Sequence, residues 1–332
     1  MTTSLGAAAL DADPVLAASL QGGLARVEDR LREVVAASHP LLREASAHLV
    51  AAGGKRVRPL LALLAAELGD PGAPGVVDAA VVVELTHLAT LYHDDVMDEA
   101  LVRRGAESAN ARWTNTVAIL TGDYLFARAS DLTAGLGTEA THLQSRTFAR
   151  LVEGQISETA GPLDGEDAVA HHLQVIADKT ASLLSTSARL GAMTAGAAPA
   201  DVETVARYGE VFGVAFQLSD DLIDITSDSA ASGKTPGTDL REGVRTLPVL
   251  LVLAGTDDES ARLRELLHAD LTDDALHAEA LALLRAHPAM DEARQRLQGY
   301  VDEARSVAAD LPDGPARDAL LGLTAFVADR TG

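Results

Sequence analysis

Two short clusters of aspartate in this chain share the pattern Asp-Asp-x-x-Asp. The first, "DDVMD", begins at Asp94, and the second, "DDLID", begins at Asp220. Each ends a strongly apolar stretch with helical periodicity. Residues four positions apart share a helix face, so Asp94 points with Asp98 and Asp220 with Asp224. Two carboxylates about 6 Å apart repel by roughly 3 kcal/mol at an effective dielectric of about 20, so both clusters need cations.

The donor atoms of both clusters are carboxylate oxygens, which select hard cations. The chain contains no cysteine, and this excludes thiolate metal sites, disulfides and a cysteine nucleophile. Mg²⁺ fits best, because it takes one or two carboxylates and completes its shell with water and substrate phosphates. Solvated acidic helix ends would explain one such cluster. Two clusters at the ends of apolar helices indicate a metal site.

The lysines of this chain are rare, and each stands among small or hydroxyl residues. Only three of the 27 basic residues are lysines: Lys55, Lys179 and Lys234. Lysine is a compact point charge that suits phosphate. Three basic residues lie just before Pro59: Lys55, Arg56 and Arg58. We expect Pro59 at the first position of a helix. Cations there oppose the helix dipole unless an anion binds, so we interpret all three lysines as phosphate ligands rather than ordinary surface residues.

Acidic clusters and dispersed cations beside apolar helices describe a site for a polyanionic head with an apolar tail. Arg103 and Arg104 follow the first cluster at once, in "DDVMDEALVRRG". Metal ions would join the head to the aspartates, and the tail would lie along the apolar helix that leads into them. The pattern therefore predicts an isoprenoid diphosphate as the ligand.

The composition narrows the class of protein. The chain has 332 residues and a net charge of −22, which argues against nucleic acid and against an anionic membrane surface as partners. The N-terminus lacks the basic region of a secretory signal, and no apolar run reaches about 18 residues without a charge. We therefore expect no membrane span and a cytoplasmic location.

Helical periodicity recurs along almost the whole chain, and no segment shows the clean alternation of a strand. We predict a single all-α domain over residues 13–330, preceded by a flexible N-terminus at residues 1–12. Asp13 and Pro14 read as an N-cap and a first helical residue. The expected helices are 14–37, 40–52, 59–69, 75–99, 109–136, 139–159, 165–196, 200–227, 246–255, 258–269, 272–286, 288–309 and 315–330.

With these motifs in place, the chain resembles the trans-type isoprenyl diphosphate synthases of the polyprenyl synthetase family. The resemblance covers roughly residues 40–325. It is carried by "GGKRVRP", "HLATLYHDDVMDEALVRRG", "GDYLFARA", "EGQ", "KTASL", "FQLSDDLIDI", "SGKTPGTDLREG" and "TLP", in this order. The resemblance implies a bundle of antiparallel helices around a deep central cavity, usually a homodimer, that joins isopentenyl diphosphate to an allylic diphosphate such as farnesyl or geranylgeranyl diphosphate.

The resemblance also implies roles for individual residues. The expected ligands of about three Mg²⁺ ions are Asp94, Asp98 and Asp220, assisted by Asp95, Asp221 and Asp224. The expected ligands of the allylic diphosphate are Arg103, Lys179 and Lys234, with Thr180 and Gln217 nearby. The expected ligands of isopentenyl diphosphate are Lys55, Arg58, His87 and Arg104. We expect two further histidines, His171 and His172, to lie on the surface. Many members carry lysine where Val244 stands here, and Val244 cannot bind phosphate.

The length of the product depends on the helix before Asp94. Short-chain members of the family block the tail tunnel with a bulky aromatic about five residues before the first aspartate. Ala89 and Thr90 are small, so we expect an open tunnel, with Phe148 as a candidate floor or, equally, as plain core packing. The predicted product is an all-trans chain of roughly thirty to fifty carbons.

Three alternative functions stay open at this stage. A short-chain synthase with a twenty-carbon product is the nearest, although Ala89 counts against it. A terpene cyclase would share the fold, but cyclases lack "GGKRVRP" and line their cavity with aromatics, whereas aromatics make up 3% of this chain. A non-catalytic regulatory subunit would be expected to have degraded aspartate clusters, and both are intact here.

Overall fold

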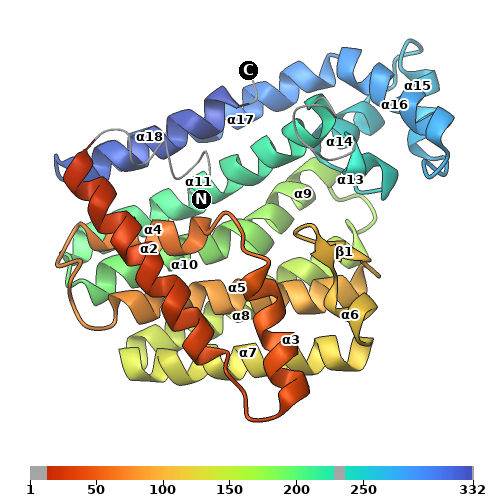
Figure 1. The fold of residues 1–332 in the computed structure, drawn as a ribbon. Helices are drawn as coiled ribbons and strands as arrows, with labels where there is room; N and C mark the ends of the chain where they lie inside the picture. Colours follow the sequence, from red (N-terminus) through yellow and green to blue (C-terminus); the bar gives the residue numbers. More distant parts are fainter. Residues whose placement is uncertain (1–12, 228–235, 331–332) are drawn as a thin grey trace. The chain divides into compact units, whose positions relative to one another are not determined.

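The computed structural model describes residues 13–227 and 236–330. Residues 1–12, for which we predict a flexible N-terminus, and Lys234 lie outside the described residues. Within them the chain is built from helices and one pair of two-residue strands, so the predicted all-α class is confirmed (Figure 1).

The described residues form two compact units, and each unit is built from separate stretches of the chain. Unit 1 comprises residues 13–150, 182–209 and 307–323, and unit 2 comprises residues 151–181, 210–227, 236–306 and 324–330. The aspartate cluster at 94–98 belongs to unit 1, and the cluster at 220–224 belongs to unit 2. The single domain expected from the sequence stays a prediction, and each unit is described by itself below.

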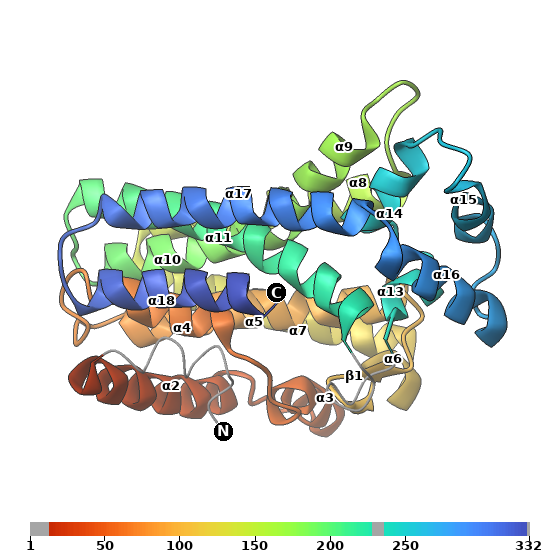
Figure 2. The same ribbon diagram turned by 90° about the horizontal axis from the view of Figure 1, so that it is seen from above.

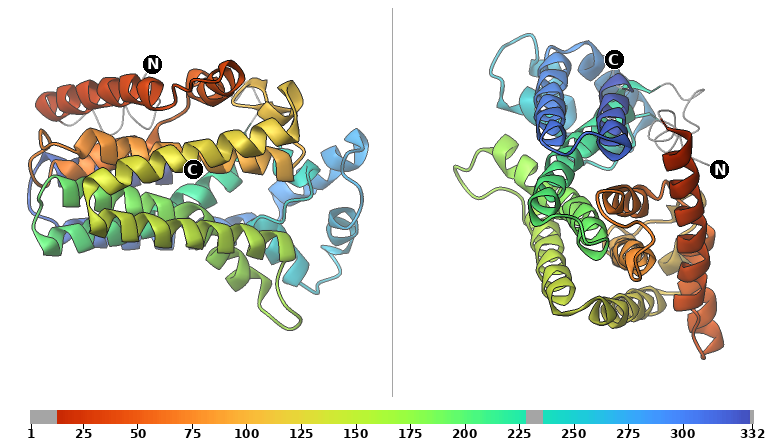
Figure 3. Two further views of the ribbon diagram at one scale, coloured as in Figure 1. Left: turned by 90° about the horizontal axis from the view of Figure 1, so that it is seen from below. Right: turned by 90° about the vertical axis from the view of Figure 1, so that its left-hand side faces the viewer.

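Helix α5 (Val76–Met97) is the centre of unit 1. It packs against α2 (Pro14–Val34), α4 (Val57–Ala66), α7 (Asn115–Leu136) and α10 (Ser182–Thr194). The view along the helices shows α4 and α5 enclosed by these neighbours (Figure 3, right). All but one residue of α4, and most residues of α5, are buried, as expected for helices that are apolar on nearly every face.

Helix α5 is also the one helix in the described part of the chain that is long and apolar enough to cross a membrane. Two thirds of the relevant window, 67%, is buried inside the structure. The core helix of a water-soluble protein passes the same test of length and composition, and the packing of α5 on four helices accounts for its hydropathy.

The predicted helix starts are confirmed at two places along the N-terminal part of unit 1. Asp13 accepts hydrogen bonds from the backbone N–H groups of Val15 and Leu16, at 2.7 and 2.9 Å, and Pro14 is the first residue of α2. Helix α3 (Pro40–Ala51) also begins with proline. Proline suits this position because the first N–H groups of a helix have no partner inside the helix.

Unit 2 contains several helices, most of them short. They are α9 (Ala168–Ile176), η1 (Ala177–Ala181), α13 (Thr238–Arg241), α14 (Leu247–Ala254), α15 (Ala261–Leu267), α16 (Asp274–Ala286) and most of α17 (Ala289–Ala309). Helix α14 packs against α9 and α15, and α13 and α15 pack against α16 (Figure 2). Three further helices contribute residues to both units: α8 (Thr138–Ala160), α11 (Pro199–Thr226) and α18 (Pro315–Asp329).

Several predicted boundaries were wrong. Helix α4 begins at Val57 rather than at Pro59. The helix expected over 109–136 is broken into α6 (Ala109–Arg112) and α7, because Thr114 leaves the helical conformation and its hydroxyl accepts from Val117 N–H as an N-cap.

Two further local structures have no clear pattern in the sequence. The segment 165–196 contains a π-helical turn, η1, between α9 and α10. The strands β1 (Val102–Arg103) and β2 (Ala106–Glu107) form a small antiparallel hairpin that is too short to show an alternating pattern.

The close packing of α10 on α4 gives the first testable prediction. A Cβ atom added at Gly191 would lie 1.9 Å from the carbonyl oxygen of Ala62, so Gly191→Ala forces two helix backbones apart. We expect the free energy of unfolding to fall by about 1–3 kcal/mol, measured by urea denaturation. Gly135→Ala is the control, because nothing lies within 4 Å of a Cβ there, and it should be neutral or stabilising by about 0.4–1 kcal/mol. Equal effects of the two variants would contradict this account of the packing.

Candidate active site

The first aspartate cluster closes the C-terminal end of α5. Asp95 is fully buried, Asp94 is partly buried and Asp98 is exposed. The backbone N–H of Asp98 still donates to the carbonyl oxygen of Asp94 at 2.8 Å, so the two residues are one helical turn apart, as the sequence predicts. Three carboxylates at a helix C-terminus are unfavourable beside the negative end of the helix dipole.

Arg103 supplies the nearest positive charge to this cluster. It lies on strand β1, and its Nε donates to Asp95 Oδ1 at 2.5 Å, while its Nη2 lies 3.8 Å from Asp98 Oδ2. Burial raises the pKa of Asp95, and Arg103 opposes that rise. The structure therefore places Arg103, an expected ligand of the allylic diphosphate, directly against the aspartates.

The cluster fits a hard cation. Asp95 Oδ2 is buried and has no hydrogen-bond partner, although a carboxylate oxygen in that position needs a donor or a cation. No group of three or more His, Asp or Glu side chains in the described residues is placed so that it could hold a metal ion by itself. A Mg²⁺ ion does not need one, because it keeps several waters and takes its remaining ligands from phosphate.

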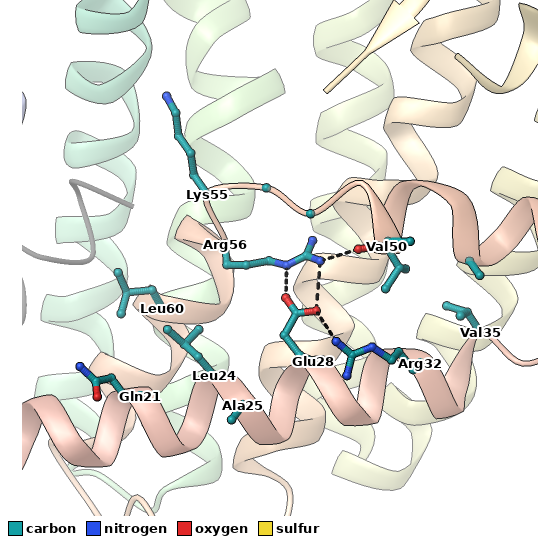
Figure 4. Close-up of a pocket in the computed structure, with 14 residues that line it drawn as sticks. Gln21, Leu24, Ala25, Glu28, Arg32, Val35, Val50, Lys55, Arg56 and Leu60 are labelled. Carbon is teal, nitrogen blue, oxygen red and sulfur yellow. Dashed lines mark hydrogen bonds and ion pairs between the residues drawn. The ribbon is translucent and has the colours of Figure 1, made fainter. Parts of the chain in front are cut away.

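A second cluster in unit 1 is basic and surrounds one buried acid, Glu84, near the middle of α5. Arg56 Nη1 donates to Glu84 Oε1 at 2.6 Å, and Arg104 Nη2 lies 3.8 Å from the same oxygen. The other edge of Arg56 donates to Glu28 Oε1 at 2.5 Å, beside a cavity of about 760 Å³ between α2, α3 and residues 53–56 (Figure 4). Lys55 is exposed and points away from Glu28 in the same view.

The backbone around the basic cluster is unusual in two places. Arg56 and Arg104 both have positive φ angles, 48° and 54°. Residues other than glycine rarely adopt such angles. Arg104 also donates to the carbonyl oxygens of Leu49 and Gly53. A Cβ at Gly54 would lie 2.9 Å from the Arg104 guanidinium carbon, so glycine is required for this close approach. Such strain is maintained at sites where function requires it.

The predicted ligands Arg58 and His87 lie in the same electrostatic environment. Burial lowers the pKa of Arg58 to about 10, an effect that Arg104 adds to and Glu84 opposes. The Nε of Arg58 is buried without a hydrogen-bond partner. Burial lowers the pKa of His87 well below its ordinary value, and the arginines around it add to that shift, so His87 is neutral at physiological pH. The cluster offers excess positive charge and a buried N–H group to an anion.

In unit 2 the predicted residues Thr180 and Gln217 are linked to the second aspartate cluster, and Lys179 has a separate partner. Lys179 Nζ donates to Glu158. Thr180 Oγ1 donates to Gln217 Oε1 at 3.1 Å, and Gln217 Nε2 donates to Asp221 Oδ1 at 2.9 Å. Lys179 and Thr180 belong to the π-helical turn η1, a distortion that often marks functional sites.

The other aspartates of the second cluster contact different partners. Asp220 Oδ1 accepts from Arg330 Nη1 at 2.8 Å. Asp224 accepts from the backbone N–H groups of Thr238 and Asp239 at the start of α13, at 3.3 and 3.1 Å. Asp220 thus lies beside a cation, as Asp95 does beside Arg103, while Asp224 tethers the next helix.

The expectation about two histidines in unit 2 was wrong, and the position of Val244 can also be described. We expected His171 and His172 on the surface, but both side chains are largely buried, at 15% and 16% exposure. His172 Nε2 lies 3.7 Å from Asp221 Oδ2. Val244 and Arg245 are exposed, and within residues 13–227 and 236–330 no side-chain hydrogen bond or ion pair joins either of them to a predicted site residue.

The three residues expected to control product length lie in unit 1. Ala89 is fully buried, and Thr90 is partly exposed. The carbonyl oxygen of Ala89 would lie 3.1 Å from a Cβ at Gly122, so α7 passes α5 closely here. Phe148 packs on Phe126, with ring centroids 4.2 Å apart. This contact is compatible with either role that the sequence left open for Phe148.

Sequence reasoning missed several residues of these clusters, among them Glu84, Arg330 and His172. Glu84 had a signal, since it is the one acid in the apolar run "VVVELTHLATLY", three residues before His87. Arg330 and His172 had none, because their partners lie 110 and 49 positions away in the sequence.

Known proteins resemble this chain in sequence and in fold. A model of the polyprenyl synthetase family matches residues 39–284. A nonaprenyl diphosphate synthase from Mycobacterium tuberculosis is 50% identical over 321 residues, which are 96% of this chain and 96% of that protein. Solved structures of a geranylgeranyl pyrophosphate synthase from Corynebacterium glutamicum, complexed with calcium and isoprenyl diphosphate, and of a decaprenyl diphosphate synthase from Rhodobacter capsulatus are also similar. Their TM-scores are 0.88 and 0.85, at 44% and 36% identity; the matches cover 97% and 96% of this chain and 99% of each of those chains.

The similar solved structures define the class of this protein, which is an all-α protein with the isoprenoid synthase fold. The chain belongs to the polyprenyl synthetase family. The family, the fold and the prenyltransferase class expected from the sequence are therefore confirmed.

The lowered pKa of His87 leads to a prediction about stability. As pH falls below the ordinary value of 6.5, the unfolded chain takes up this proton before the folded protein does. The free energy of unfolding therefore declines below about pH 6.5, by at most about 1.4 kcal/mol per pH unit from this residue. In His87→Gln the decline between about pH 7.5 and 5.5 should be shallower, measured by urea denaturation.

His142→Gln, on the exposed part of α8, is the control for this measurement and should keep the wild-type slope. Parallel curves for wild type and His87→Gln would show that His87 is not held in its neutral form.

Proposed function

We propose that this protein is a Mg²⁺-dependent trans-polyprenyl diphosphate synthase. It condenses isopentenyl diphosphate head-to-tail onto an allylic diphosphate to give an all-trans product of about thirty to fifty carbons. The observation that carries the proposal is that two clusters of unlike charge lie along α5, a basic one around Glu84 and an acidic one at Asp94. The acidic cluster at Asp94 needs metal to bind a diphosphate, whereas the basic cluster at Glu84 binds one through cations alone.

The basic cluster suits isopentenyl diphosphate, which must be held without being activated. Arg58 and Arg104 bring fixed positive charge and N–H donors to the phosphates, with Lys55 at the exposed side. His87 is neutral, so it contributes a hydrogen bond and no further charge. Guanidinium groups stay protonated even when burial lowers their pKa, so the site keeps its charge.

The acidic clusters suit the allylic diphosphate, whose carbon–oxygen bond must break. Asp94, Asp98 and Asp220 would hold the metal ions, with Asp95, Asp221 and Asp224 supporting them. Bound Mg²⁺ would neutralise the charge that develops on the leaving diphosphate. Arg103 and Lys179 each lie beside a carboxylate within their own unit, and both are proposed, with Lys234, as ligands of the allylic diphosphate from the resemblance.

The reaction then needs no nucleophilic side chain. The carbon–oxygen bond of the allylic diphosphate breaks, and the double bond of isopentenyl diphosphate attacks the resulting allylic cation to form a carbon–carbon bond. Loss of a proton restores an alkene, with the departing diphosphate as the proposed acceptor. Preorganised charge that stabilises the leaving group is the main contribution of the protein. We also propose a cytoplasmic homodimer with about three Mg²⁺ ions per site, as the family resemblance implies.

The main alternative is a shorter, twenty-carbon product. The similar proteins include both kinds, since one is a nonaprenyl diphosphate synthase and another a geranylgeranyl pyrophosphate synthase. The small side chains of Ala89 and Thr90 favour the longer product, because they leave the start of the tail path without an aromatic barrier. The relatives are named as synthases, and this supports an elongating enzyme over a cyclase.

The metal site leads to a prediction with two readouts. Asp94→Asn removes one carboxylate charge and should lower kcat roughly 100-fold or more. Mg²⁺ with inorganic diphosphate should raise the melting temperature of the wild type by mass action, and the variant should lose most of that shift. Asp131→Asn, at an acid with 71% side-chain exposure, is the control and should behave as wild type. A normal shift in Asp94→Asn would exclude Asp94 as a metal ligand.

Product length gives a further prediction. Thr90 is partly exposed, so Thr90→Phe can place an aromatic on the tail path, whereas Ala89→Phe would also overpack the α5–α7 contact at a cost of about 1–3 kcal/mol. We expect Thr90→Phe to stop elongation at twenty-five carbons or fewer, measured by chromatography of dephosphorylated products. Thr90→Val, which nearly conserves volume, should leave the product ladder unchanged. An unchanged ladder in Thr90→Phe would place the tail elsewhere.

A further inference from the structure

Glu84 is a buried acid that the proposed reaction does not use. Its side chain is 2% exposed, and it interrupts an otherwise apolar segment of α5. Burying a carboxylate is costly unless cations and hydrogen-bond donors compensate. A residue of this kind in a core helix therefore requires a physical reason.

The partners of Glu84 come from two separate segments of unit 1. Arg56 stands just before α4 and donates to Glu84 Oε1 at 2.6 Å. Arg104 stands in the turn between β1 and β2, and its Nη2 lies 3.8 Å from the same oxygen. Arg58 also interacts electrostatically with Glu84. One carboxylate thus joins two loops that are far apart in sequence.

The arginines would repel one another without this carboxylate. The charges of Arg56 and Arg103 act against Arg104, and the charge of Arg104 acts against Arg58. The two arginines nearest Glu84 also have positive φ angles, so their backbones are held in a conformation of higher energy. Glu84 offsets the repulsion between the arginines and the strain of their backbones, because it is a buried negative charge close to the guanidinium groups of Arg56 and Arg104.

We propose that Glu84 is a positioning residue for isopentenyl diphosphate: it holds Arg56 and Arg104 in place so that Arg104, Arg58 and His87 face the bound diphosphate. This inference rests on the proposed function. Glu84 and His87 are three residues apart on α5 and therefore lie on neighbouring positions of one helix face. The carboxylate does not cancel the site's charge, since three guanidinium groups surround it and the other acid on Arg56, Glu28, is 30% exposed.

The test is a comparison of steady-state kinetics with the two substrates varied separately. Glu84→Gln keeps the shape of the side chain and removes its charge. We expect the KM for isopentenyl diphosphate to rise roughly ten- to a hundred-fold, the range for a lost charged hydrogen bond. The KM for the allylic diphosphate should stay within about two-fold. A merely structural role would affect both substrates or the melting temperature alone.

Glu28→Gln is the matched control, because it removes the other carboxylate on Arg56. Glu28 pairs with Arg56 from the partly exposed side and does not bridge Arg56 to Arg104, so the KM for isopentenyl diphosphate should change less than about three-fold. An equal rise in both variants would assign the effect to Arg56 alone and overturn the role of Glu84.

Glu84→Asp keeps the proposal testable if Glu84→Gln fails to fold. It retains the charge but withdraws it by one methylene, so the KM for isopentenyl diphosphate should lie between those of the wild type and of a neutral variant. A wild-type KM for isopentenyl diphosphate in either folded variant, or equal rises for both substrates, would overturn the inference. Failure of the wild type itself to elongate would instead overturn the proposed function.

Discussion

The structure of unit 1 depends on one constraint: the charges of a buried helix must be balanced by residues from other segments. Helix α5 is enclosed by four helices, yet it carries Glu84 near its middle and an aspartate cluster at its end. Arg56 and Arg104 balance the first, and Arg103 balances part of the second. The loop before α4 and the hairpin after α5 therefore take their positions from charge pairing with the core helix, and the same pairing gathers the cations that a diphosphate requires.

The sequence predicted the parts of this arrangement that depend on local pattern. The apolar helix, the aspartates at its end and the family were all correctly predicted, because helical periodicity and short motifs survive in a single sequence. The start of α4 was misplaced because proline is only one determinant of a helix start, and the left-handed Arg56 in front of it has no local signature. Glu84 stood out locally as an acid in an apolar run, but its partners Arg56 and Arg104 are distant in the chain, so its role could not be predicted. The turn η1 was missed because a π-helical turn has the same composition as an α-helix.

The two charged clusters on α5 differ in their balance of charge, and this difference suits the proposed chemistry. Around Glu84, cations exceed carboxylates and His87 is neutral, so a diphosphate would bind there directly and stay attached to its carbon chain. Around Asp94, carboxylates exceed cations, so a diphosphate would bind there only with metal ions, which would also favour its departure. In this proposal one substrate is held and the other is activated, although both carry the same head group.

Because both clusters lie on α5, the helix backbone fixes the distance between them, and the side chains between them do not affect it. An α-helix rises about 1.5 Å per residue, so Glu84 and Asp94 are about 15 Å apart along a rigid rod, and only an insertion or deletion alters that spacing. Thr90 lies between them and is partly exposed, so it can be exchanged for a larger residue without moving either cluster, whereas Ala89 is packed closely against α7. Under the proposed function, product length can therefore diverge among related proteins through residues such as Thr90, while the spacing of the two proposed diphosphate sites stays fixed.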